Sequence, residues 1–191
     1  SAFLLNRSSD LDLMGGSVDT YGNTSPWAEF NIQIDPEAFS IVLNAFQTED
    51  IRSWVTLIPL DVTHTVLSTP EVIKKLDENN KFENLIIKLL YFFKETYQNV
   101  FGFSSPPVHD PVAAYYIVHP EDFEVKHEQA VVETQGKYTS GSICINRYPK
   151  ISNWCDKNEL KEIDICRKVN VDKFWDSIIE HLHILAKNSP L

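Results

Sequence analysis

The sequence of 191 residues contains no apolar run close to the roughly 20 residues that a membrane-spanning helix requires, so no membrane span is expected. Residues 1–14, SAFLLNRSSDLDLM, lack a basic segment followed by a long apolar one, so no signal peptide is expected either. Cysteine is scarce, and Cys144, Cys155 and Cys166 include no C-x-x-C pair. An odd number of widely spaced cysteines favours a reducing, cytoplasmic compartment over a disulfide scaffold.

Basic residues are also few. The chain has 17 Lys and Arg against 27 Asp and Glu, for a formal net charge of −10. This balance argues against a nucleic-acid partner, because the phosphate backbone attracts basic proteins. The acidic residues are scattered along the chain, as on a solvated surface. With 43% hydrophobic and 23% charged residues, the composition is that of a globular protein, and the length fits one domain with a sizeable core.

Patterns in the first half of the chain predict helices around a buried strand. Asp35 and Pro36 fit the cap and the first residue of a helix. The expected apolar face of this helix consists of Ala38, Ile41, Val42 and Ala45. Residues 53–62, SWVTLIPLDV, have the branched apolar profile of a strand that is buried on both faces.

Two more helices are expected before residue 103. Ser68 and Glu71 fit a capping box that opens a short helix, which ends near Asp77. Residues 81–100 have the amphipathic pattern of a longer helix, and Gly102 fits its C-terminal cap.

The second half of the chain continues the alternation of helices and strands. Residues 111–120 fit a buried helix, 129–136 and 141–146 a pair of strands, and 147–164 a loop. Residues 171–187 fit a helix with one apolar side, made of Phe174, Trp175, Ile178, Ile179, Leu182 and Leu185. The alternation predicts an α/β fold with an open, largely parallel sheet.

In such a sheet, ligands bind beyond the carboxyl ends of the strands. The segments expected at that edge are LMGGS (13–17), LDVTH (60–64) and the loop that holds His109. Asp61, Thr63 and His64 of the second segment are either a polar cluster or turn-forming residues, and turn formation is favoured. His119, His127, His181 and His183 show no metal-ligand spacing.

Glu29 and Asn31 are candidate binding residues. If they lie on a strand, they face the same way and Phe30 faces the opposite way. A carboxylate and a carboxamide that project together suit a pair of hydroxyl groups, such as those of a sugar. The alternative is that both are exposed residues at the end of a strand.

His109 and Asp110 form a second candidate pair. An imidazole can protonate a leaving group, and a carboxylate can ligate Ca²⁺ or Mg²⁺. The alternative is a histidine in solvent beside an aspartate that caps the helix beginning at Pro111. Local sequence does not decide between the two interpretations.

Four segments, taken together, resemble the nucleoside hydrolases, which are Ca²⁺-dependent N-ribohydrolases. The segments follow the order found in that family: LMGGS (13–17), GNTSPWAEFNIQIDPEA (22–38), PLDVTH (59–64) and PPVHDPVAAYYI (106–117). A histidine directly before the aspartate is similar to the pyrimidine-preferring and uridine-hydrolysing members. The resemblance implies a Rossmann-like, doubly wound fold and hydrolysis of ribonucleosides, such as uridine, in nucleoside salvage.

The resemblance also implies roles for residues on the sugar side. Met14 corresponds to a methionine packed under the sugar. Asn23 and Glu29 correspond to residues that hold the 5′-hydroxyl, and Phe30 belongs to the same motif. Asn31 corresponds to the asparagine that binds the ribose near its 3′-hydroxyl and the metal, which makes it a candidate catalytic residue.

On the other side of the scissile bond, His109 corresponds to the histidine that helps the nucleobase leave, and Asp110 to a Ca²⁺ ligand. Phe93, Tyr97 and Phe101 recur at helical spacing, so they share one side of the 81–100 helix and its end. Tyr97 and Phe101 are candidates for stacking on the base. The alternative is that this aromatic stripe belongs to the core.

One family motif, the aspartate-rich D-x-D-x-G-x-D-D, does not occur in the sequence. We therefore expect residues 1–191 to be the C-terminal part of a single nucleoside hydrolase domain. Ca²⁺ takes 6 to 8 oxygen ligands, more than Asp110 and ribose hydroxyls supply. The resemblance implies a homo-oligomer or a companion chain that carries the N-terminal half. The alternative function is a non-catalytic fragment or subunit that binds ribose or supports oligomerisation.

Overall fold

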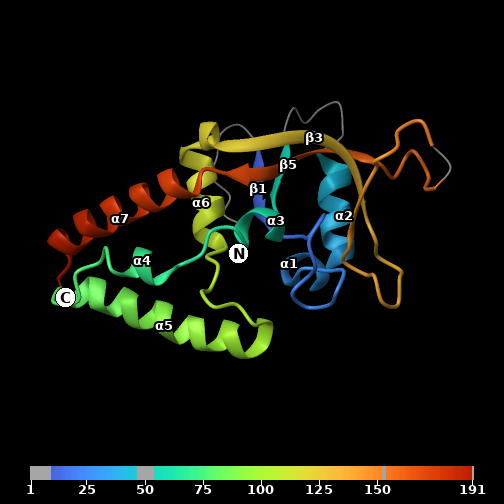
Figure 1. Cartoon of the computed structure of the whole chain (residues 1–191). Coiled ribbons are helices and arrows are strands. Elements are labelled where there is room, and N and C mark those ends of the chain that lie inside the picture. Colours follow the sequence, from blue (N-terminus) through green and yellow to red (C-terminus); the bar gives the residue numbers. More distant parts are fainter. Residues whose placement is uncertain (1–9, 47–53, 152–153, 191) are drawn as a thin grey trace. The chain divides into compact units, whose positions relative to one another are not determined.

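The structure is a computed structural model, which describes residues 10–46, 54–151 and 154–190 (Figure 1). It divides into two compact units. The sheet unit comprises the described residues up to Thr63 together with His109–Val169. The helical unit comprises His64–Val108 and the described residues from Asn170 onward. The first 14 residues considered above are described only from Asp10, and Ser53 of the predicted strand lies outside the described residues.

One sheet of five strands forms the centre of the sheet unit. The strands are β1 (Leu11–Met14), β2 (Val55–Ile58), β3 (Phe123–Val132), β4 (Ile143–Ile145) and β5 (Lys161–Val169). Their order is β1-β2-β5-β3-β4. Strands β1, β2 and β5 are parallel, whereas β3 pairs antiparallel with β5 and β4. The α/β prediction is confirmed, and three of the five strands run parallel.

Helices cover the two faces of this sheet (Figure 1). The helices of the unit are α1 (Phe30–Gln33), α2 (Pro36–Ala45), α3 (Leu60–Thr63), α6 (Asp110–Val118) and the 3₁₀ turn η1 (Pro120–Asp122). On one face, Ile32 of α1 and Phe39 of α2 pack in a cluster with Leu57. On the other face, Tyr116 of α6 is hydrogen-bonded to Thr56, the neighbour of Leu57 along β2. Because side chains alternate along a strand, α6 covers the opposite face from α2.

Strand β2 confirms the predicted strand, since all four of its residues are buried. The predicted pair of strands is also confirmed as β3 and β4, although β3 begins earlier, at Phe123. Strand β5 is a correction, because residues 161–164 were expected to be loop. Ile163 and Ile165 are fully buried at the centre of the sheet.

Helix α2 begins as predicted, because the Asp35 carboxylate accepts a hydrogen bond from the Ala38 N–H at 2.9 Å. Its predicted apolar face is wrong. Ile41 is 68% exposed, and the buried residues are Pro36, Phe39 and Leu43. The periodicity identified a helix but placed its buried side one position away from the real one.

The helical unit contains α4 (Pro70–Ile73), α5 (Lys81–Phe101) and α7 (Val171–Asn188). Helix α5 ends as predicted, with Gly102 in the left-handed conformation. The predicted capping box is wrong, because Thr69 caps α4 through a hydrogen bond from Val72 N–H. The hydroxyl of Ser68 instead donates to the Pro106 carbonyl at 3.0 Å, and α4 ends at Ile73, before the expected Asp77.

Helices α5 and α7 pack against each other in the helical unit. Glu83 is buried, and its carboxylate lies 2.9 Å from His183 Nδ1 and accepts a hydrogen bond from Asp77 N–H. The buried side of α7 includes Phe174, Trp175 and Ile179, as predicted, but Leu185 is exposed.

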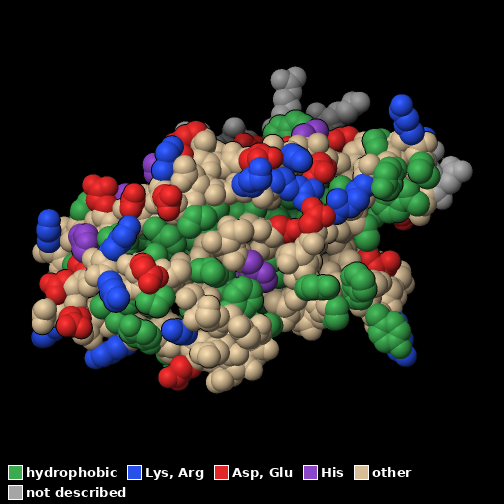
Figure 2. Space-filling view, in the orientation of Figure 1, with side chains coloured by type: hydrophobic (Ala, Val, Ile, Leu, Met, Phe, Trp, Pro, Cys, Tyr) green, Lys and Arg blue, Asp and Glu red, His purple; other side chains and the backbone are tan. Residues whose placement is uncertain are grey.

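Charged side chains of both signs lie together over β3 and β5 (Figure 2). Arg167 pairs with Glu128 and with Asp19, and Lys168 with Glu124 at 2.8 Å. This fits the solvated surface that the scattered acidic residues suggested. Within the part of the chain that the structure describes, no helix is long and apolar enough to cross a membrane.

Candidate functional site

The candidate site begins at the carboxyl end of β1, where two glycines turn the chain. Gly16 has a φ of +77°, a conformation that side-chain-bearing residues rarely adopt. A Cβ at Gly15 would lie 3.3 Å from Glu29 Oε2. The Gly16 carbonyl accepts a hydrogen bond from Leu60 N–H at 2.9 Å, which joins this turn to the residues after β2. LMGGS and LDVTH therefore meet at one edge of the sheet, as predicted.

Glu29 fixes this turn from within. It is 2% exposed, and its carboxylate accepts hydrogen bonds from the backbone N–H groups of Gly16 (2.9 Å), Asn31 (2.9 Å) and Ile32 (3.3 Å). Residues 30–33 form the short helix α1 with Glu29 as its N-cap. The expected strand at Glu29 and Asn31 is therefore wrong, and so is the alternative of two exposed strand-end residues.

Burial raises the pKa of the Glu29 carboxyl. The three backbone N–H donors oppose this rise, and the nearby negative charge of Asp110 adds to it. Glu29 and Asp110 are far apart in sequence but both belong to the sheet unit, where their negative charges repel each other.

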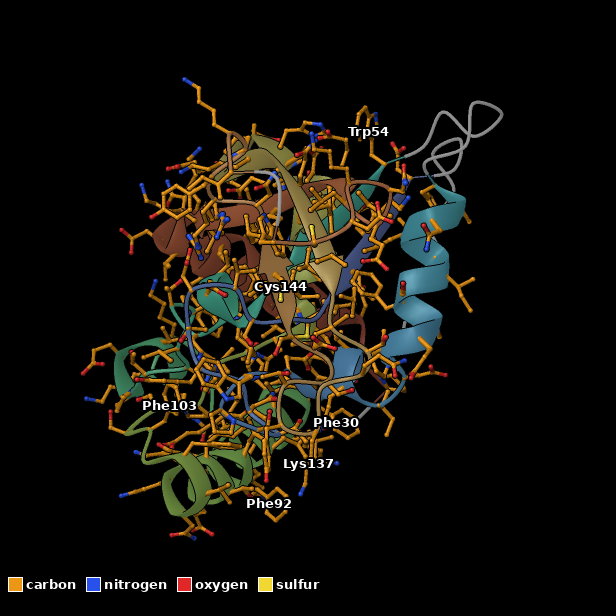
Figure 3. The ribbon with its side chains drawn as sticks, turned by 90° about the vertical axis from the view of Figure 1, so that its right-hand side faces the viewer. Phe30, Trp54, Phe92, Phe103, Lys137 and Cys144 are labelled. Carbon is orange, nitrogen blue, oxygen red and sulfur yellow. The ribbon has the colours of Figure 1, made fainter. Side chains whose placement is uncertain are left out.

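Asn31 faces Met14, the last residue of β1. Its Nδ2 donates to the Met14 carbonyl at 3.2 Å and lies 3.3 Å from Met14 Sδ. Asn23 Oδ1 accepts a hydrogen bond from Phe30 N–H at 2.9 Å, which ties the preceding loop to α1. Phe30 itself is 53% exposed (Figure 3). The structure thus brings Met14, Asn23, Glu29 and Asn31 together. Glu29 and Asn31 lie at the start of α1 rather than on a strand.

Helix α3 connects the turn after β1 with the beginning of α6. The Asp61 carboxylate accepts hydrogen bonds from Val18 N–H at 2.9 Å and Asp19 N–H at 2.6 Å. Two residues later, Thr63 Oγ1 lies 2.8 Å from His109 Nδ1. The expectation that these residues serve chiefly as turn formers missed both contacts, which span more than 40 positions of sequence and have no local signal.

Asp110 is the first residue of α6, and His109 occupies the cap position without a side-chain capping hydrogen bond. The interpretation of Asp110 as the helix cap is therefore wrong. Asp110 is exposed in the first turn of this helix. The contact of His109 with Thr63 and the hydrogen bond of Leu60 N–H with the Gly16 carbonyl join the start of α6 to the loops after β2 and β1.

The acidic and amide oxygens of this cluster suit a hard divalent cation. Asp110 would be the ligand, because both oxygens of Glu29 already accept backbone hydrogen bonds. A single carboxylate supplies at most two of the six to eight oxygens that Ca²⁺ takes. The residues described here therefore fit such an ion as part of its coordination shell.

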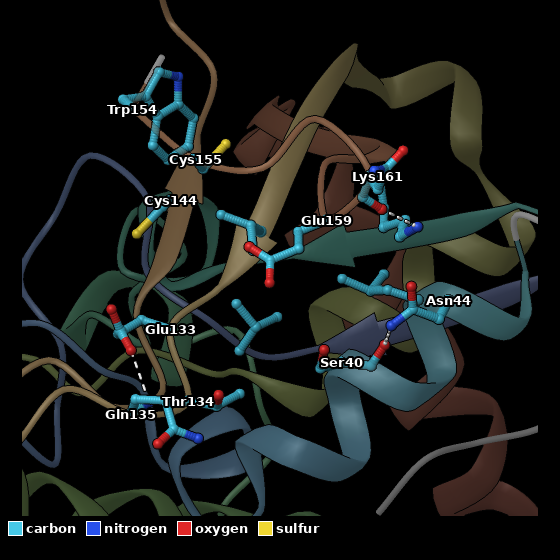
Figure 4. Close-up of a pocket in the computed structure, with 14 residues that line it drawn as sticks. Ser40, Asn44, Glu133, Thr134, Gln135, Cys144, Trp154, Cys155, Glu159 and Lys161 are labelled. Atoms are coloured by element: carbon cyan, nitrogen blue, oxygen red, sulfur yellow. Dashed lines mark hydrogen bonds between the residues drawn. The ribbon is translucent and has the colours of Figure 1, made fainter. Parts of the chain in front are cut away.

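A separate cavity of about 560 Å³ lies in the sheet unit, between α2 and the ends of β3 and β4 (Figure 4). Glu133, Cys144, Cys155 and Glu159 are among its lining residues. Burial raises the pKa of the Cys144 thiol. The residues of the candidate site do not line this cavity, so the cavity is not part of the site.

His119 lies near two acidic residues. Ligand atoms of His119, Glu121 and Asp122 all lie within 4.8 Å of one another. Asp122 also accepts a hydrogen bond from the Tyr115 hydroxyl at 2.7 Å, and burial together with this carboxylate raises the pKa of Tyr115. Exposed groups of this kind are common without a metal, so the cluster does not define a second site.

Tyr97 and Phe101 belong to the helical unit, where they form part of an aromatic cluster. The ring centroid of Tyr97 lies 4.6 Å from that of Phe93, 5.0 Å from that of Phe101 and 5.9 Å from that of Phe103. Tyr97 is buried and Phe101 is partly exposed. Their assignment to a base-binding surface stays a prediction.

Comparisons with known proteins identify the family of the chain. The family model described as "Inosine-uridine preferring nucleoside hydrolase" matches residues 4–176. A "Probable ribonucleoside hydrolase" of Dictyostelium discoideum is 33% identical over 89% of this chain and 48% of its own length. An "Inosine-uridine preferring nucleoside hydrolase" of Leishmania major is 35% identical over 94% of this chain and 53% of its own length.

A solved structure shows the same fold. The "Purine-Preferring Ribonucleoside Hydrolase from Gardnerella vaginalis" superposes with a TM-score of 0.75 and 26% identity, and the match covers 93% of this chain and 53% of that one. The chain thus spans about half the length of the curated relatives that it matches. Members of this family are generally metal-dependent. On the family match and the fold, the chain belongs to the inosine-uridine preferring nucleoside hydrolase family.

Proposed function

We propose that the protein hydrolyses the N-glycosidic bond of ribonucleosides, with uridine or other pyrimidine nucleosides preferred, to give ribose and the free base. The observation that carries this proposal is the joining of two pairs of residues at one edge of the sheet. Glu29 and Asn31 come from the start of α1, and His109 and Asp110 from the start of α6. The hydrogen bonds of Gly16 with Glu29 and Leu60, and the contact of Thr63 with His109, join the two pairs. The family match supplies the reaction class.

The sugar side would hold the ribose by its hydroxyl groups. Cleavage of the bond develops positive charge on the ribosyl group, so an acidic surrounding stabilises the transition state more than the ground state. Glu29, Asp110 and the Asn31 carboxamide supply that surrounding. Asn23 and Glu29 would meet the 5′-hydroxyl, with Phe30 beside them, and Met14 would pack under the ring. Because backbone hydrogen bonds hold Glu29, this surface needs little reorganisation when substrate binds.

The metal would be Ca²⁺, with Asp110 as one ligand. Such an ion, when bound, would orient a water molecule and lower its pKa, and a carboxylate near the ion would accept the proton of that water. The contribution of this chain is a carboxylate held at the start of α6, next to the residues proposed to orient the ribose.

On the base side, His109 would stabilise the departing base through Nε2, because Thr63 engages the other ring nitrogen. Help of this kind contributes typically about 10² to 10⁴-fold to a rate. Tyr97 and Phe101 would stack on the base. The relatives named above differ in base preference, so the choice of uridine rests on the histidine before Asp110.

Steady-state ribose release from uridine and inosine by the full-length protein tests the proposal. We expect the variant His109→Ala to lower kcat on uridine by about 100-fold, with a small change in KM. His119→Ala is the matched control, because it removes a histidine of the same unit outside the site. Equal turnover by His109→Ala and His119→Ala would remove His109 from the mechanism. A role in nucleoside salvage, a cytoplasmic location and a homo-oligomeric state or companion chain remain predictions.

A further inference from the structure

Thr63 is a buried polar residue in contact with His109. It is the last residue of α3 and its exposed fraction is 0%. Its hydroxyl oxygen lies 2.8 Å from His109 Nδ1, across 46 positions of sequence. A hydroxyl group in so buried a place needs a hydrogen-bond partner, and His109 provides one.

The position of His109 makes this contact important. His109 occupies the cap position of α6, and its side chain makes no capping hydrogen bond to that helix. The terminal torsion of a histidine has broad minima, so a hydrogen bond at Nδ1 narrows the orientations of the ring. Thr63 comes from α3, and Asp61 of the same helix accepts hydrogen bonds from the backbone N–H groups of Val18 and Asp19.

We propose that Thr63 is a positioning residue for His109, whose hydroxyl donates to Nδ1 and so keeps the hydrogen of the neutral ring on Nε2. This inference rests on the proposed function, in which His109 meets the leaving base. As the C–N bond breaks, its electron pair remains on the base, and the Nε2–H hydrogen bond stabilises the negative charge that develops there. The other tautomer would present a lone pair to the base and could not do so.

Two substitutions separate the hydroxyl from the rest of the side chain. Thr63→Val keeps the branched shape at a fully buried position and removes the hydrogen-bonding group, whereas Thr63→Ser keeps the hydroxyl and loses a methyl group. A role of Thr63 in packing alone predicts that Thr63→Ser is the more harmful change. A role through the hydroxyl predicts that Thr63→Val lowers the catalytic rate more than Thr63→Ser does.

The first readout is the dependence of the rate on the leaving group. Uridine needs stabilisation of its departing base, whereas 4-nitrophenyl β-D-ribofuranoside releases a stable phenolate without such help. We expect Thr63→Val to lower kcat on uridine by roughly 10 to 100-fold with little change in KM, because misplacing a hydrogen-bond donor loses part of its contribution. The nitrophenyl riboside should lose less than about 3-fold, and Thr63→Ser should stay close to wild type on both substrates. Equal losses on the two substrates, or none, would overturn the proposal.

The second readout is the ¹⁵N NMR spectrum of the histidine rings in the full-length protein, recorded at a pH at which they are neutral. The His109 signals are assigned by their loss in His109→Gln. We expect Nδ1 at the position of an unprotonated nitrogen and Nε2 at that of a protonated one in wild type, and a mixture of tautomers in Thr63→Val. A protonated Nδ1 in wild type would refute the proposal even in an active enzyme. If the protein shows the expected tautomer but cleaves no nucleoside, the proposed function is refuted, whereas the contact between Thr63 and His109 stands.

Discussion

The variant Glu29→Gln tests whether the carboxylate of Glu29 holds the site together. The carboxylate accepts three backbone hydrogen bonds, two at Oε2 and one at Oε1. An amide of the same size can keep its oxygen at the Oε2 position, where it would still meet Gly16 and Ile32. Its NH₂ group would then face the N–H of Asn31, and that buried donor would lose its acceptor.

The expected cost follows from these contacts. A hydrogen bond to a charged group contributes about 1.5–3 kcal/mol, and an unpaired buried donor costs about 1–3 kcal/mol. Relief from burying a charge offsets part of this loss, since burial disfavours the ionised carboxyl. We therefore expect a loss of about 2–3 kcal/mol in the free energy of unfolding. For a protein of this size that corresponds to a drop in Tm of roughly 4–12 °C, at about 2–4 °C per kcal/mol.

Thermal and chemical denaturation followed by circular dichroism measure this loss. Glu37→Gln is the matched control, because Glu37 is exposed in the first turn of α2 and its charge there is worth only about 0.3–1 kcal/mol. If Glu29→Gln and Glu37→Gln melt at the same temperature, the hydrogen-bonded carboxylate does not support the fold, and the argument for a preorganised site fails.

The pH dependence of this effect has a definite sign. The pKa of Glu29 is raised above its usual value of 4.5. The stability that comes from this shift is fully present below pH 4.5 and is lost as the pH rises through the raised value. Glutamine does not titrate, so the penalty of Glu29→Gln should be larger at pH 4 than at pH 7. An equal penalty at both pH values would contradict the raised pKa.

Three further predictions concern other contacts. Asp61→Ala should cost about 1–2 kcal/mol in urea denaturation, because it removes the acceptor of two backbone hydrogen bonds; an unchanged midpoint would show that α3 does not hold the turn after β1. Glu83→Gln should lower the stability by about 1–3 kcal/mol through its contacts with His183 and Asp77, and a loss below about 0.5 kcal/mol would contradict this. Cys166 is fully buried with a raised pKa, so Ellman's reagent should modify it only after unfolding; rapid modification in the native protein would refute its burial.

Local chemistry predicted those elements that local interactions determine. Gly102 ended α5 and Asp35 capped α2 as expected, because a cap depends on residues within four positions. Strand β2 was also predictable, since burial on both faces leaves a continuous apolar run.

Tertiary contacts determined the elements that the sequence did not predict. Strand β5 carries charged residues at five of its nine positions, and its pairing with β2 and β3 buries Ile163 and Ile165. The stretch at Glu29 and Asn31 alternates like a strand, but the Glu29 carboxylate accepts the first N–H groups of a helix instead. A single capping interaction therefore outweighed the strand-like pattern, as happens when propensity is weak.

The candidate site followed the same division. The order of four motifs suggested its residues, whose roles stay predictions. The meeting of the loops after β1 and β2 was predictable from the direction of parallel strands. The contact of Thr63 with His109 was not predictable, because it joins residues far apart in sequence through geometry alone. Neither was the burial of Glu29, which depends on the turn at Gly16.

The most direct test of the account is ribose release from uridine by the full-length protein in the presence of Ca²⁺, comparing wild type with Asp110→Asn. Asp172→Asn is the control, since Asp172 is exposed in the first turn of α7. We predict that wild type and Asp172→Asn release ribose and uracil in equal amounts. Asp110→Asn should be slower by at least about 100-fold and should need more Ca²⁺, as expected when a metal ligand is lost. Absence of ribose release by wild type, or an unchanged rate in Asp110→Asn, would contradict the account.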